Sequence, residues 1–223
     1  MNDFKSYGSM DELSAAVAGA IAGGLREAVS LRGAASFVAS GGGTPKPVYG
    51  RLSMDTSVPW DKITVTLSDE RMAPSAAKVS NAEMLRLHLV RDAANEATFI
   101  PLDDTSALDD VSAPFDVVLL GMGADGHFAS IFPEGEGMDA ALAANAPRLV
   151  ETTPSPLPPE APYPRISLSL EAIRRSRSVF LMISGDSKRE IYDRAASDDP
   201  AGDLPIRKLL HDPDLPLSTF WAP

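Results

Sequence analysis

The sequence of 223 residues contains no cysteine. Disulfide bonds, zinc sites built from thiolates and a thiol nucleophile are therefore excluded, so any nucleophile must be a hydroxyl, a carboxylate, an amine or water. Long apolar runs are also missing, because no stretch approaches the roughly 20 apolar residues that a membrane helix requires. The first residues lack the basic-then-apolar order of a signal peptide, and we expect a cytoplasmic protein.

Positive charge is scarce, because 20 Lys and Arg residues stand against 31 Asp and Glu residues, for a net charge of −11. This charge repels nucleic acid and anionic membranes, so neither is expected as a partner. A small anionic substrate would be repelled too unless basic side chains gather locally, which makes the positions of individual cations informative. With 44% hydrophobic residues, the composition predicts one globular domain over 1–223, and we expect a monomer or a weak homodimer.

Strand-like runs alternate with helix-like runs along the chain. A capping box at Ser9 precedes apolar residues at every fourth position, which predicts an amphipathic first helix with Leu13, Val17, Ile21 and Leu25 on its buried face. Further helix starts are predicted at Thr44-Pro45, at Ser80 (to about Val90) and at Ser187. Strands are predicted at 36–39, 63–67, 97–102, 115–120, 165–170 and 178–184, with an edge strand at 218–221. The alternation predicts an α/β fold with a doubly wound, mostly parallel open sheet and helices on both faces.

A glycine-rich turn, Gly-Met-Gly-Ala-Asp-Gly-His at 121–127, directly follows the predicted strand at 115–120. Ligands of α/β proteins bind in the crevice outside the carboxyl ends of the strands. Glycines such as Gly123 let the backbone approach a ligand closely, while Asp125 and His127 supply proton-transfer groups near neutral pH. We therefore expect a ligand site at this turn.

The same turn satisfies the G-x-G-x-x-G pattern of dinucleotide-binding proteins. That pattern requires a full helix after the turn and an acidic residue about 20 positions further on. Pro133 and two glycines after it interrupt the chain almost at once, so a dinucleotide site is disfavoured.

Other predicted strand ends carry charge or glycine. Three glycines at 41–43, followed by Thr44 and Lys46, lead into a helix start and predict an anion site. Arg71 ends a charged triplet after the strand at 63–67, and arginine binds carboxylate or phosphate through a planar fork. The simpler interpretation of each cation is a solvated surface group. Lys188 argues against it, because a first helical turn disfavours positive charge unless an anion is present.

Six segments match one known family in order along the chain: 40–49, 69–71, 80–81, 121–133, 164–169 and 185–188. On these segments the chain resembles the 6-phosphogluconolactonase family, and the resemblance implies a Rossmann-like sheet shared with glucosamine-6-phosphate deaminase and ribose-5-phosphate isomerase. It also implies that no metal or cofactor is required. The implied activity is hydrolysis of 6-phospho-D-glucono-1,5-lactone to 6-phospho-D-gluconate in the oxidative pentose phosphate pathway. The interval 91–114 is shorter than in the family and lacks an evident helix.

Carried over by position, the resemblance makes His127 the general base that activates water, with Asp69 and Asp125 shaping the polar site around it. A histidine of ordinary pKa near 6.5 suits this task at neutral pH. The groups implied to hold the phosphate and the sugar oxygens are Gly41, Gly42, Gly43, Thr44, Lys46, Arg71, Gly123, Arg165 and Lys188.

Two other functions are compatible with these segments. A glucosamine-6-phosphate deaminase would need a further acid after the histidine, where this chain has Phe132 before Pro133. A sugar-phosphate-binding protein without catalysis would explain the glycines and the cations but leaves His127 without a task.

Overall fold

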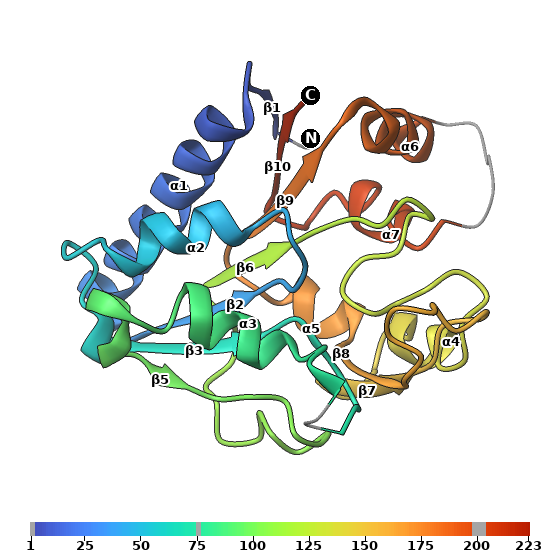
Figure 1. The fold of residues 1–223 in the computed structure, drawn as a ribbon, viewed down its shortest axis with the longest axis horizontal. Helices are drawn as coiled ribbons and strands as arrows, with labels where there is room; N and C mark the ends of the chain where they lie inside the picture. The colour runs from blue at the N-terminus through green and yellow to red at the C-terminus, as the bar shows by residue number, and fades with distance from the viewer. Residues whose placement is uncertain (1–2, 75–76, 198–203) are drawn as a thin grey trace.

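The computed structural model describes residues 3–74, 77–197 and 204–223. Its central feature is a seven-stranded parallel sheet (Figure 1). In spatial order the strands are β1 (Asp3–Ser6), β10 (Leu217–Ala222), β9 (Val179–Ser184), β6 (Val117–Leu120), β2 (Ala35–Ala39), β3 (Ile63–Leu67) and β5 (Thr98–Phe99). A second, antiparallel sheet has the order β4 (Asp69–Arg71), β8 (Arg165–Leu168) and β7 (Leu149–Thr152). The predicted α/β fold with a mostly parallel sheet is confirmed.

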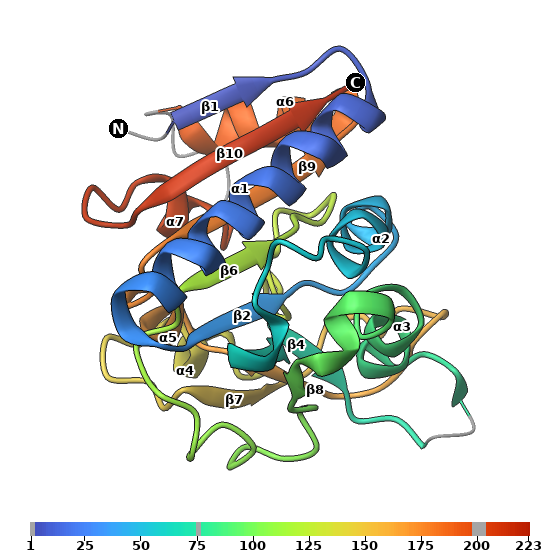
Figure 2. The ribbon, with the colours of Figure 1, turned by 90° about the vertical axis from the view of Figure 1, so that its left-hand side faces the viewer.

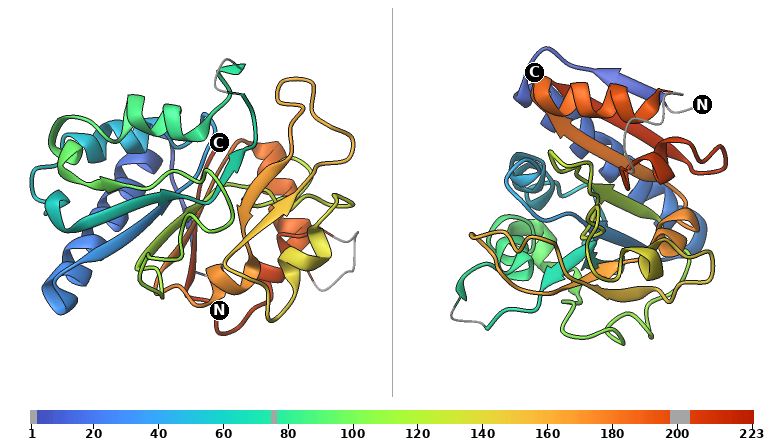
Figure 3. Two further views of the ribbon diagram at one scale, coloured as in Figure 1. Left: turned by 90° about the horizontal axis from the view of Figure 1, so that it is seen from below. Right: turned by 90° about the vertical axis from the view of Figure 1, so that its right-hand side faces the viewer.

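Helices cover both faces of the parallel sheet (Figures 2 and 3). One face carries α1 (Met10–Arg32), α2 (Lys46–Ser53) and α3 (Asn81–His88). The other carries α4 (Met138–Leu142), α5 (Leu170–Arg174), α6 (Asp186–Ala196), α7 (Arg207–Leu210) and the second sheet. Two 3-10 turns, η1 (Trp60–Lys62) and η3 (Asp92–Glu96), flank β3 and β5. Among the helices of the described residues, none is both long and apolar enough to span a membrane.

Helix α1 forms as its sequence predicts. Ser9 caps it by accepting a hydrogen bond from the backbone N–H of Glu12 at 3.2 Å. The four apolar residues predicted to be buried, Leu13, Val17, Ile21 and Leu25, are all fully buried. A Cβ at Gly24 would lie 3.0 Å from Val117, so glycine lets the helix pack closely against β6. The apolar stripe and this close approach fix α1 on the sheet.

Several element ends differ from the prediction. Helix α2 has Pro45 rather than Thr44 at its N-cap position, and α6 begins after Gly185, so the predicted cap at Ser187 is wrong. Gly185 adopts a φ of +87°, which glycine tolerates. Helix α3 ends at His88, two residues earlier than predicted.

The strands differ from the prediction mainly at the edges of the two sheets. β10 is not an edge strand, because β1 pairs with it in parallel on its outer side. β1 is short, polar and mostly exposed, so it has no apolar run that sequence analysis could detect. The strand predicted at 97–102 shrinks to the two residues of β5, and the interval 91–114 contains no α-helix, as expected.

The strand order creates a switch point between β6 and β2. From β2 the chain builds outward through β3 to β5, then returns to β6 on the opposite side of β2 and builds outward again through β9. The loops after β2 and β6 therefore leave the sheet in opposite directions and open a crevice, which is where α/β proteins bind ligands.

Candidate active site

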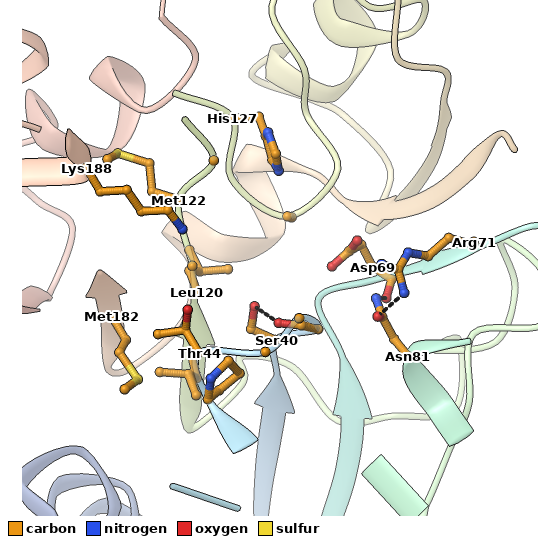
Figure 4. Close-up of a pocket in the computed structure, with 18 residues that line it drawn as sticks. Ser40, Thr44, Asp69, Arg71, Asn81, Leu120, Met122, His127, Met182 and Lys188 are labelled. Atoms are coloured by element: carbon orange, nitrogen blue, oxygen red, sulfur yellow. Dashed lines mark hydrogen bonds between the residues drawn. The ribbon is translucent and has the colours of Figure 1, made fainter. Parts of the chain in front are cut away.

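A cavity of about 260 Å³ lies in this crevice (Figure 4). His127, Lys188 and Asp69 approach it from three different sides (Figure 4). Segments that follow β2, β3, β6 and β9 all contribute to its wall. The predicted site residues that line it are Gly41, Gly42, Gly43, Thr44, Asp69, Arg71, Gly123, His127 and Lys188.

The glycine loop after β2 is shaped by contacts that exclude side chains. A Cβ at Gly41 would collide with the amide of Asn81, and Gly42 adopts a φ of +90°. Below the loop, the buried Tyr49 hydroxyl donates a hydrogen bond to the carbonyl of Ser40 at 2.5 Å. Within the described residues, the backbone N–H groups of 42–44 find no acceptor. They precede helix α2 and are available to an anion.

Asp69, the first residue of β4, has a fixed carboxylate. Its Oδ1 accepts a hydrogen bond from the Ser68 hydroxyl at 2.7 Å, and its Oδ2 accepts one from the Ser130 hydroxyl at 2.7 Å. Only 9% of the residue is exposed, and that face lines the cavity. Since both donors are neutral hydroxyls, the carboxylate keeps lone pairs for further donors.

Glu70 and Arg71 organise the entrance to helix α3. The Glu70 carboxylate accepts hydrogen bonds from the backbone N–H groups of Asn81 and Ala82 at 2.8 and 2.7 Å, and from the Ser80 hydroxyl at 2.8 Å. A carboxylate is favourable at a helix N-terminus. Arg71 Nη1 donates to the carbonyl of Val79 at 2.6 Å and to the side-chain oxygen of Asn81. Arg71 is therefore held in place before any substrate binds.

His127 is oriented by Asp125. The imidazole Nδ1 lies 2.6 Å from Asp125 Oδ1, and the backbone N–H of His127 donates to the same oxygen at 3.2 Å. Burial opposes ionisation of Asp125, but the hydrogen bonds and charge of His127 outweigh it, so the pKa of Asp125 lies below its usual value. A Cβ at Gly123 would overlap the imidazole, which explains the glycine there. Phe132 packs against the ring with centroids 4.4 Å apart.

Lys188 lies in the first turn of α6 and lines the cavity (Figure 4). Burial lowers the pKa of Lys188, and the nearby charge of Asp125 offsets this only in part. Within the described part of the chain, its ammonium group makes no ion pair within 4.0 Å. Partial burial, the lack of an ion-pair partner and the helix N-terminus each make a positive charge unfavourable at this position. A bound anion would offset all three effects.

Arg165 and Lys46 lie outside this cavity. Arg165 and Asp125 line an adjoining hollow of about 710 Å³, whose outer wall is the proline-rich loop between β7 and β8. The two hollows share Asp69, Arg71, His127 and Ala129. Lys46 is exposed and lines neither hollow.

Arg165 is 97% buried, and its guanidinium donates hydrogen bonds to the backbone carbonyls of Ala161 and Tyr163 in the proline-rich loop. Burial, and then the charge of Arg71 opposite it on β4, lower the pKa of Arg165. Arg165 thus holds the proline-rich loop in place and faces the hollow mainly as a buried positive charge.

Sequence analysis missed the polar residues that hold the site together. Ser130 lies in a motif-bearing segment, but a hydroxyl among apolar residues carries no signal of its contact with β4. In the sequence, Glu70 is only one charge of the triplet at 69–71. Its role could have been suspected, because Ser80 is a predicted N-cap and an additional buried carboxylate suits a helix start.

Comparison with known proteins assigns the chain to a family. Residues 8–221 match the family described as glucosamine-6-phosphate isomerases/6-phosphogluconolactonase. The chain is 38% identical to a 6-phosphogluconolactonase of Caulobacter vibrioides, over 98% of this chain and 96% of that protein. It is 35% identical to one of Mesorhizobium japonicum, over 99% and 95% of the two chains.

Solved structures agree with this assignment. The crystal structure of a 6-phosphogluconolactonase from Shewanella baltica superposes with a TM-score of 0.91 at 37% identity, covering 100% of this chain and 98% of that chain. A monomeric glucosamine-6-phosphate deaminase shares the fold, with a TM-score of 0.75 at 19% identity over 99% and 97% of the chains. The chain therefore belongs to the glucosamine-6-phosphate isomerase/6-phosphogluconolactonase family.

Proposed function

We propose that this protein hydrolyses 6-phospho-D-glucono-1,5-lactone to 6-phospho-D-gluconate. The names of its relatives at 35–38% identity support this activity over the deaminase branch of the family. The observation that carries the proposal is the convergence of a carboxylate-bound imidazole, an unpaired ammonium group and a glycine loop on one cavity. Such a cavity can grip a phosphate at one end and activate water at the other.

In the proposed mechanism His127 is the general base. A carboxylate can only accept hydrogen bonds, so Asp125 holds the imidazole with its proton on Nδ1 and its free lone pair on Nε2. Nε2 has no hydrogen-bond partner among the described residues, and water can occupy that position. The negative charge of Asp125 also stabilises the imidazolium that forms when Nε2 takes a proton.

The reaction then proceeds in two steps. His127 Nε2 removes a proton from water as the water oxygen bonds to the lactone carbonyl carbon, which places negative charge on the carbonyl oxygen. When this charge returns to the carbonyl, the bond to the ring oxygen breaks, and the imidazolium returns its proton to that oxygen. The new carboxylic acid loses its proton to solvent. No redox partner or metal enters this balance.

The remaining predicted residues are proposed to bind substrate. The free backbone N–H groups of the glycine loop, with Thr44, Arg71 and Lys188, would hold the phosphate and sugar oxygens. Asp69 would accept hydrogen bonds from sugar hydroxyls, because its carboxylate lines the cavity with lone pairs to spare. Arg165 and Lys46 would contribute through charge at longer range.

The proposal is tested by a pH-stat or coupled assay on freshly generated lactone, corrected for spontaneous opening. We expect lactone loss that scales with enzyme concentration. Release of ammonia from glucosamine 6-phosphate, without lactone hydrolysis, would instead place the protein with the deaminases. Tight binding of 6-phosphogluconate with no acceleration would indicate a binding protein and would contradict the mechanism.

A further inference from the structure

We propose that Ser130 is a positioning residue, which acts on the reaction through Asp69 by fixing its carboxylate relative to His127. The inference rests on the proposed lactone hydrolysis. It starts from the separate origins of the two groups: His127 stands in a loop after β6 of the parallel sheet, whereas Asp69 begins β4 of the antiparallel sheet. Their relative placement therefore depends on contacts between two sheets.

One hydrogen bond joins the histidine loop directly to strand β4. Within the described residues, the Ser130 hydroxyl bond to Asp69 Oδ2, at 2.7 Å, is the only hydrogen bond between the loop 121–131 and strand β4. Ser130 is three positions after His127 in the same loop. A movement of the histidine loop is thus transmitted to the Asp69 carboxylate through this hydroxyl.

Ser130 is itself rigidly held. It is 1% exposed, its backbone N–H donates to the Ser167 hydroxyl at 3.1 Å, and its carbonyl accepts from the Thr152 hydroxyl at 2.6 Å. These partners lie on β8 and β7. Between His127 and Ser130, Ala129 adopts a φ of +47°, a conformation that residues other than glycine rarely take. The backbone is held in an unfavourable turn that directs the hydroxyl to Asp69.

The chemical consequence concerns the direction of the Asp69 carboxylate. Hydroxyl donors from Ser68 and Ser130 each bind one carboxylate oxygen, which fixes the plane of the group. The remaining lone pairs then accept substrate hydroxyls in a defined direction. Without Ser130, the carboxylate can rotate about its Cβ–Cγ bond.

The test is a double-mutant cycle with Ser130→Ala and Asp69→Asn, read as kcat and KM on the lactone. We expect Ser130→Ala to lower kcat about tenfold in the wild-type background, the scale of one hydrogen bond to a charged group, with KM within about twofold. In the Asp69→Asn background the same change should alter kcat by less than about twofold. Equal losses in both backgrounds, or no loss in either, would overturn the inference.

A graded series provides a second readout, which also decides the matter if Asp69→Asn retains no activity. The loss of kcat should follow donor strength and be larger in Ser130→Ala than in Ser130→Cys, because a thiol is a weak donor. Ser14→Ala is the matched control, since it removes a buried hydroxyl that donates only within α1. A loss of kcat as large in Ser14→Ala as in Ser130→Ala would contradict the role.

Ser130→Cys keeps nearly the same volume and replaces the cycle's alanine variant if that variant does not fold. We expect an intermediate loss of kcat, because a thiol is a weak donor. A wild-type enzyme that does not accelerate lactone opening would refute the proposed function itself. If the wild type is active and the effects of the two substitutions on kcat are additive, only the role of Ser130 is refuted.

Discussion

The two sheets contribute to the site in opposite ways. Groups on the segments that follow strands of the parallel sheet keep a free atom: His127 Nε2 and Lys188 Nζ have no hydrogen-bond partner within the described residues. Groups on the antiparallel sheet are bound by the protein itself. Both oxygens of Asp69 accept hydrogen bonds from protein hydroxyls, Arg71 Nη1 donates to protein oxygens, and both terminal nitrogens of Arg165 donate to backbone carbonyls.

This difference separates the groups that serve the substrate alone from the groups that also hold the cavity in shape. A base must have an open lone pair, and a phosphate-binding cation gains most when no protein anion competes. Framework groups instead gain from being fully hydrogen-bonded, because a buried polar group without a partner costs about 1–3 kcal/mol. Substitutions in the two sheets should therefore affect kinetics and stability differently.

The largest expected effect is that of His127→Ala. Loss of the proposed general base should lower kcat at least tenfold, and by about 10²–10⁴-fold if the base makes its usual contribution, with little change in the denaturation midpoint. His88→Ala, in the last turn of α3, is the matched control and should leave kcat unchanged. Steady-state kinetics on fresh lactone provides the measurement, and wild-type turnover in His127→Ala would remove this residue from the mechanism.

The difference between the two sheets is tested most directly by Lys188→Ala and Arg71→Ala. Each should raise KM by roughly 10–100-fold, because each removes charged hydrogen bonds to the substrate. Only Arg71→Ala should also lower stability, by about 1–3 kcal/mol, because it leaves the Asn81 side chain and the Val79 carbonyl without their donor. Equal denaturant midpoints for the two variants, or a kcat defect with unchanged KM, would contradict the division between sheets.

Much of the parallel sheet could be predicted from sequence because its order is local. Strands buried on both faces have continuous apolar runs, as in β2, β3, β6 and β9, and α1 carries a regular apolar stripe. The antiparallel sheet has no such signal. β4 consists of Asp69, Glu70 and Arg71, and it is a strand only because β8, nearly 100 positions later, pairs with it.

The site shows the same division. The glycine turn, His127 and Asp125 lie close in sequence, so their association could be inferred from spacing and chemistry. The contact of Ser130 with Asp69 depends on packing between sheets, which no local pattern encodes. The occupied donors of Arg165 also could not be foreseen, because its acceptors are backbone carbonyls of the proline-rich loop.

A smaller effect is expected from pH. Burial lowers the pKa of Lys188 from 10.5, so its ammonium group loses charge earlier in the alkaline range than an ordinary lysine does. KM should therefore rise by up to about tenfold as pH rises toward 10.5, whereas Lys188→Arg should keep KM flat over that range. The free energy of unfolding should increase over the same pH range. Between the lowered pKa of Lys188 in the folded protein and its ordinary pKa in the unfolded chain, the unfolded chain binds more protons, so stability increases with pH.

KM measured against pH for both forms, corrected for spontaneous lactone opening, provides the test. An equal rise of KM with pH in the wild type and in Lys188→Arg would mean that another group titrates.

The smallest effect should come from Lys46→Ala. Lys46 is exposed and lines neither hollow, so it can act on an anionic substrate only through solvent. We expect a rise in KM of at most about twofold, which disappears near 1 M salt because screening then shortens the range of charge to about 3 Å. The KM defect of Lys188→Ala should persist under those conditions, since a direct contact with the phosphate is less screened. A salt-resistant, tenfold defect in Lys46→Ala would mean that the glycine loop closes over the substrate and brings Lys46 into contact with it.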